Sequence, residues 1–182
     1  MRHEASPGDG PHCSPYWIHV YDDRYVAALL NPVHANFANP QLWICEGEEP
    51  TLDDLGLKRG VKACTTIKRV SLPRFTVNQR VAFAIYCTLE THPPKTWVKW
   101  AQGWLDGSDR SAAEAEAAKR AAEAAGEETW AEAAWAAAWA AAEAGVAWVV
   151  AWAAAPAAKR AALDLPALAR KAYHFERKGR TA

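Results

Sequence analysis

His12, Cys13 and His19 carry side chains that bind metal ions, because imidazole and thiolate are the usual donors of zinc sites. His12 and Cys13 would lie in an N-terminal arm and His19 in a strand, and an arm and a strand rarely form a metal site unaided. No two of the chain's six histidines stand at metal-ligand spacing on one predicted helix (His3, His12, His19, His34, His92 and His174). We therefore expect no metal and no cofactor.

Carboxylates are the second group that could do chemistry. Glu46, Glu48 and Glu49 follow a predicted strand and could form a cluster for acid–base catalysis. Solvated charge at the end of a strand explains the same residues, and we adopt that interpretation. The glycine-containing stretch GLKRG lacks the spacing of a phosphate-binding loop. The sequence therefore predicts no catalytic residue, and we expect a protein that is not an enzyme.

Charged residues are balanced in number but unevenly placed. The 21 basic and 21 acidic residues give a net charge of zero, so charge alone does not favour nucleic acid or an anionic membrane. An acidic group in the predicted helices is our expected partner-binding surface, because helices hold charges at fixed spacing; it comprises Glu114, Glu116, Glu123, Glu127 and Glu128. The alternative surface is a basic tail, Lys171, Arg177, Lys178 and Arg180.

The tail also interleaves Tyr173 and Phe175 with basic residues, a combination that suits single-stranded nucleic acid. Cations at the end of a helix explain the same pattern, because they complement the helix dipole. We therefore rank nucleic acid below another protein as the partner.

The first part of the chain is predicted to position these groups on a small antiparallel sheet. Residues 1–15 contain three prolines and two glycines and are predicted to form a flexible arm. Residues 16–21, 41–49 and 61–73 have the β-branched or alternating composition of strands, and Asp22-Asp23 begins a short helix over 22–30. Asn-Pro pairs mark 31–40 as a loop, and 51–60 is predicted to be a turn. The β-rich module thus spans residues 16–75, with its sheet over about 16–73.

From residue 76 to 182 the pattern is helical. Thr76 is the predicted cap of the first helix, and Pro93-Pro94 precede a helix with Trp97, Trp100 and Trp104 on one face. Asp109 or Ser111 caps the next helix, which Gly126 ends. An alanine- and tryptophan-rich helix over about 127–155 carries indoles on opposite faces, so neighbouring helices or another subunit must cover both faces. The predicted fold class is α+β.

Cysteine usage and hydropathy bear on the compartment. Cys13, Cys45, Cys64 and Cys87 form no C-x-x-C pair, and the first ten residues do not resemble a signal peptide. We expect reduced thiols in the cytoplasm of a bacterial host cell. The apolar run 144–155 is shorter than the ~20 residues that a membrane-spanning helix needs, so we expect no membrane partner.

Three stretches give the chain a family resemblance. They are WIHVYDDRYVAALL, LWICEGEEPTLDDLGLKRGVKACTTIKRVSLP, and the run from VAFAIYCTLE through WLDGSDRS into the alanine-rich tract. Together they resemble small immunity-type proteins of phages and mobile elements, which have a β-rich N-terminal module and an alanine-rich helical half. In addition, WIHVY, YVAALL and LWICEGE resemble, in their order, half of an ADP-ribosyltransferase core, although the catalytic positions of that family have no match here.

Two functional hypotheses follow from these observations. The first is a non-catalytic protein that binds another protein, in the immunity or counter-defence class, for example an anti-CRISPR-like inhibitor of a nucleic-acid-binding bacterial defence complex. The second is an ADP-ribosyltransferase-related module that binds a ligand, or acts on it, in a pocket beside His19 and Glu46.

Overall fold

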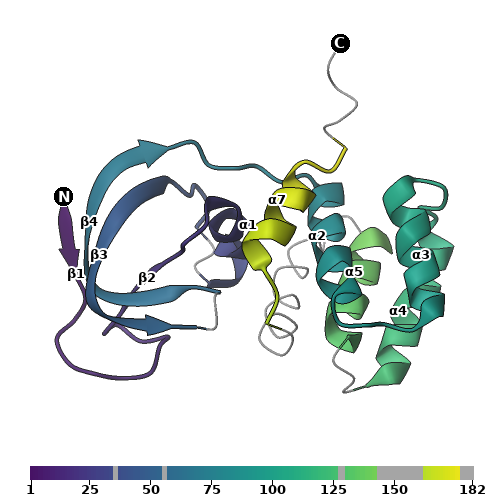
Figure 1. The fold of residues 1–182 in the computed structure, drawn as a ribbon, viewed down its shortest axis with the longest axis horizontal. Helices are drawn as coiled ribbons and strands as arrows, with labels where there is room; N and C mark the ends of the chain where they lie inside the picture. The colour runs from purple at the N-terminus through teal and green to yellow at the C-terminus, as the bar shows by residue number, and fades with distance from the viewer. Residues whose placement is uncertain (35–36, 55–56, 127–129, 143–161, 177–182) are drawn as a thin grey trace, which may run out of the picture.

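A curved antiparallel sheet forms one end of the molecule and a group of helices forms the other (Figure 1). The computed structural model describes residues 1–34, 37–54, 57–126, 130–142 and 162–176. Within them, helices α1 (Arg24–His34) and α7 (Leu165–Tyr173) lie between the sheet and the remaining helices. This arrangement confirms the predicted α+β class.

Strand β4 is the centre of the sheet. It spans Arg59–Val70 and pairs in antiparallel fashion with β1 (Arg2–Glu4), β2 (Ile18–Val20) and β3 (Leu42–Asp53). Ala63 pairs with both Glu4 and Glu48, so β1 and β3 lie on opposite edges of β4; β2 shares the edge of β1. Register shifts after Ile44 and after Glu48 interrupt the β3–β4 pairing. Such bulges increase the local twist, in keeping with the marked curvature of this hairpin (Figure 1).

Three of the differences between the predicted boundaries of the first module and the structure have clear causes. Residues 1–15, predicted as a flexible arm, contain β1, because three polar residues pair with β4 without any apolar alternation. Helix α1 continues to His34 through the start of the predicted loop, because burial of Val26, Leu29 and Leu30 anchors it. The predicted turn over 51–60 is narrower, since Thr51–Asp53 and Arg59-Gly60 are paired in the hairpin.

The helical half begins where the sequence predicts it. Thr76 forms a capping box with Gln79 at the start of α2 (Val77–Leu89), and Pro94 precedes α3 (Lys95–Asp106). The Ser111 side chain caps α4 (Ala112–Ala125), and Gly126 follows with a φ of 63°. Helix α5 covers Ala131–Ala142. The rest of the long helix predicted to reach residue 155 lies outside the described residues.

Alanine, more than tryptophan, fills the contact between α4 and α5. Ala115 and Ala122 on α4 and Ala134 and Ala137 on α5 are all buried, and such small side chains let helix backbones approach closely. Trp97, Trp100 and Trp104 of α3 are buried, as predicted from their shared face. Trp139 of α5 is only half-buried, because the alanine face of this helix occupies the interior.

Helix α7 joins the two halves. It packs against both α1 and α2, and its Tyr173 ring lies 4.7 Å from the Tyr25 ring and 5.4 Å from the Phe75 ring, centroid to centroid. No helix in the described part of the chain has the length and apolar character needed to cross a bilayer.

Candidate functional site

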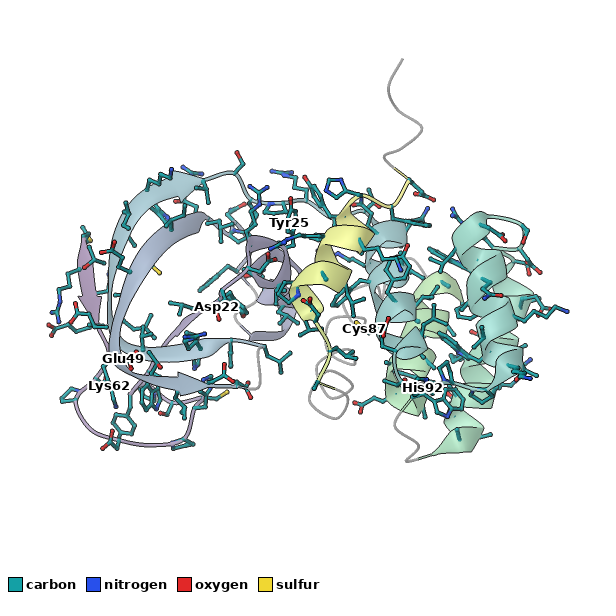
Figure 2. All side chains as sticks on the ribbon, in the orientation of Figure 1. Asp22, Tyr25, Glu49, Lys62, Cys87 and His92 are labelled. Atoms are coloured by element: carbon teal, nitrogen blue, oxygen red, sulfur yellow. The ribbon has the colours of Figure 1, made fainter. Side chains whose placement is uncertain are left out.

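A wide groove lies between the curved sheet and the segment that leads from β2 into α1. Its volume is about 1280 Å³, and its walls come from β2, α1, the start of β3, facing residues of β4, and Arg170 of α7. Figure 2 shows Asp22 between the curved sheet and α1, and Tyr25 where α1 meets α7; both residues line the groove. The volume exceeds the ~300–1,000 Å³ typical of small-molecule pockets.

One wall of the groove is apolar and open to solvent. Phe37, Trp43 and Ile44 line it with exposed fractions of 67%, 46% and 44%. Among the described residues, the other large hydrophobic side chains with comparable exposure are Met1, Ile67 and Val77, and none of these three lines the groove. Exposed apolar groups gathered in a concave surface are typical of partner-binding sites.

Strand β3 adds an open backbone edge to this wall. It pairs with β4 along one edge, and within the described ranges no strand pairs with its other edge. A free edge presents unpaired N–H and C=O groups, which can accept an additional strand. Trp43 and Ile44 lie on this strand, so the exposed apolar side chains and the free backbone edge are contiguous.

The two carboxylates at the other wall are each paired with an arginine. Asp23 Oδ1 accepts hydrogen bonds from the backbone N–H groups of Tyr25 (2.8 Å) and Val26 (3.1 Å) and so caps α1. Its second oxygen accepts from Arg170 at 2.8 Å, while Asp22 forms an ion pair of 2.7 Å with Arg59. The two carboxylates are therefore neutralised, and this wall carries no strong negative potential.

Titratable groups in the groove tend toward their neutral forms. Burial, followed by the charges of Lys58 and His12, lowers the pKa of His19 against the opposing effect of its backbone hydrogen bond. Burial also raises the pKa of the Tyr21 hydroxyl, and burial together with Cys64 raises the pKa of the Cys45 thiol. At neutral pH these side chains thus present uncharged polar groups.

A second cluster lies where the N-terminal segment packs against β2. His12, Cys13 and His19 each bring one potential ligand atom within 4.8 Å of the other two. Lys58, from the turn between β3 and β4, places its ammonium 3.2 Å from Cys13 Sγ and is itself only 5% exposed. The sequence singled out the three residues but placed them on separate elements, and it gave no signal for Lys58.

The predicted acidic surface is not gathered on one face of α4. Glu114 and Glu116 lie about 200° apart around a helix that turns 100° per residue. Glu116 accepts a hydrogen bond from Lys119 at 2.9 Å, and Glu123 accepts one from the Trp135 indole at 2.8 Å. Glu127 and Glu128 lie outside the described residues.

The predicted basic tail is described only in part. Lys171 places its ammonium 4.0 Å from the centroid of the Tyr86 ring, whereas Arg177, Lys178 and Arg180 fall outside the described residues. Phe175 stacks on Trp104 with centroids 5.8 Å apart, and Tyr173 packs into the core. These two aromatic rings are therefore used within the fold.

The three strand glutamates are exposed, as expected for solvated charge. Glu48 receives two hydrogen bonds from Arg2, at 2.8 and 2.9 Å, which hold its pKa below the usual range. His19 lines the groove, but Glu46 is not among the lining residues, so the structure does not bring together the pair named in the ADP-ribosyltransferase hypothesis.

Comparison of the chain with protein-family models, with curated proteins and with solved structures found no match.

Proposed function

We propose that this chain is a non-catalytic protein-binding protein and that its partner docks in the groove beside β3. The observation that carries the proposal is the position of Phe37, Trp43 and Ile44, which are exposed and line the same concave surface. A partner that covers these side chains would remove their apolar surface from water, which would lower the free energy of the complex.

The partner segment is extended and largely apolar. The free edge of β3 offers main-chain hydrogen bonds to an added strand, and the apolar residues of the groove can contact the side chains of that strand. The size of the groove suits a peptide segment better than a small molecule. The groove lining has no excess of basic charge that would favour a phosphate backbone, because Asp22 and Asp23 balance Arg24 and Arg170, which supports protein over nucleic acid as partner.

We assign the protein to the immunity or counter-defence class, where the partner is a bacterial defence complex. The resemblance to small proteins of phages and mobile elements supports this assignment. The glutamates of α4 and the basic C-terminal residues remain candidate secondary surfaces that would steer association.

The test begins with affinity capture from a bacterial lysate, identification of the captured protein by mass spectrometry, and measurement of its affinity for the purified chain. Trp43→Lys and Ile44→Lys should each weaken binding at least about tenfold, because they place a charge in the apolar wall. Ile67→Lys is the matched control, since Ile67 is 54% exposed on β4 but does not line the groove.

Equal affinities for all three variants and the unaltered chain would contradict docking in the groove. Calorimetry with nicotinamide dinucleotide and with ADP-ribose tests the alternative, because binding of either would favour the ADP-ribosyltransferase-related module. The proposal predicts no heat of binding with these two compounds.

A further inference from the structure

We propose that His12, Cys13 and His19 form a binding site for a divalent transition-metal ion of the zinc type. The three side chains offer one ligand atom each, all within 4.8 Å of one another. Two imidazole nitrogens and one thiolate are a donor set that zinc prefers. Tetrahedral geometry with zinc bond lengths separates such atoms by roughly 3.5 Å, so the ligand atoms must move closer together to complete the site. The rings of His12 and His19, which are stacked with centroids 5.0 Å apart, must also turn so that their nitrogen lone pairs converge on the ion.

Both histidines are held in one tautomer by backbone carbonyls. His12 Nε2 lies 3.1 Å from Leu52 O, and His19 Nε2 lies 2.6 Å from His12 O. Since a carbonyl oxygen can only accept, each Nε2 carries the proton and each Nδ1 carries a lone pair. A ligating histidine in metalloproteins typically donates its second N–H to such a group, which fixes the ring and strengthens the ligand.

The lone pair on Nδ1 of His12 has no hydrogen-bond partner among the described residues. Its Nδ1 atom is buried, and no described group of the protein makes a hydrogen bond with it. A buried polar atom without a hydrogen bond is normally satisfied by a water molecule, a hydrogen-bond donor or an ion.

Lys58 lies beside the side chain of Cys13. It is only 5% exposed, and its ammonium donates a hydrogen bond of 3.2 Å to Cys13 Sγ. The thiolate, and not the thiol, is the form that ligates a metal.

The backbone brings the N-terminal segment close enough for this arrangement. A Cβ atom on Gly60 would lie 3.2 Å from Trp17 and 3.3 Å from His12 Nε2, so glycine allows the His12 ring to sit against β4. Trp17 Nε1 donates to Gly10 O at 3.0 Å, and Ser6 N donates to Pro15 O at 3.0 Å, which closes the loop that carries His12 and Cys13. Cys13 is exposed, so the fourth coordination position faces solvent.

The test uses the full-length, chelator-treated and reduced protein, titrated with Co²⁺ as a spectroscopic probe and then with Zn²⁺. The expected result is one equivalent of bound Co²⁺ with a thiolate-to-metal charge-transfer band, lost on adding Zn²⁺. Cys13→Ser should abolish the band, and His12→Gln or His19→Gln should weaken Co²⁺ binding at least about tenfold, the lower bound for loss of a supporting group. Cys45→Ser and His174→Gln are the matched controls and should leave the spectrum unchanged.

Cys13→Ser is a small change at an exposed position, so a folded variant is expected, and circular dichroism verifies it. As a second readout, Zn²⁺ should slow amide hydrogen exchange in residues 8–16 of the unaltered chain and not in Cys13→Ser. Absence of the charge-transfer band in the unaltered protein, or a band that survives Cys13→Ser, would overturn the proposal.

Discussion

The two carboxylate oxygens of Asp23 make different contacts. Replacements that remove one or both contacts should therefore destabilise the fold to different degrees. One oxygen caps α1 through the N–H groups of Tyr25 and Val26, and the other receives the guanidinium of Arg170 from α7. The Asp23 side chain is 7% exposed and that of Arg170 is 60% exposed. The cap is therefore the larger contribution, because the ion pair is screened on its arginine side.

The magnitudes follow from this division. Loss of an N-cap costs about 1 kcal/mol, and an ion pair with one exposed partner contributes at most about 1 kcal/mol more. Asp23→Ala should thus lower the free energy of unfolding by about 2 kcal/mol. Asp23→Asn retains a capping oxygen and loses only the charge, so it should cost less than about 1 kcal/mol, as should Arg170→Ala.

Urea denaturation followed by far-UV circular dichroism measures all three variants and the double variant Asp23→Ala/Arg170→Ala. The double variant should be destabilised by less than the sum of the two single changes, with a coupling energy up to about 1 kcal/mol. If Asp23→Asn is as destabilising as Asp23→Ala, the cap is not the main contribution and the reasoning is refuted. A loss below about 0.5 kcal/mol in Asp23→Ala would refute both roles.

Three further predictions concern packing, titration and the acidic helix. Ala137 is fully buried on α5, so Ala137→Leu should destabilise the fold by about 1–3 kcal/mol in urea melts, whereas Ala117→Leu at an exposed position should not. Burial raises the pKa of the Cys45 thiol in the folded state, so the neutral thiol contributes to the stability of the fold at neutral pH. This contribution should decline as pH rises above the unfolded thiol pKa of ~8.5. In urea melts at several pH values, Cys45→Ser should make the loss of stability at high pH smaller. Glu123→Ala should cost about 1 kcal/mol because the Trp135 indole loses its acceptor, while Glu123→Gln, which keeps an acceptor, should cost less in the same melts.

Local sequence signals predicted the starts of several helices. Asp23, Thr76 and Ser111 were recognisable as caps because each is a short polar residue directly before a helical pattern. The buried face of α3 followed from the spacing of its tryptophans, and the change from alternating to helical periodicity near residue 75 located the boundary between sheet and helices.

Contacts between distant residues could not be predicted in this way. Strand β1 consists of polar residues whose only signal is their pairing with β4, and the groove depends on the curvature of a hairpin with two register shifts. Lys58 meets Cys13 across 45 positions of sequence. The large indole of Trp139 would favour burial, but Trp139 is only half-buried, because the close approach of α4 and α5 leaves the interior to alanine.

Hydrogen exchange of the chain with its captured partner tests the central claim, docking along the free edge of β3. We expect the partner to slow amide exchange in residues 41–46 and to leave α5 unaffected, because an added strand supplies acceptors for the free N–H groups of β3. Protection confined to α4, with unchanged exchange in residues 41–46, would contradict the proposed groove and would favour the acidic helix surface as the docking site.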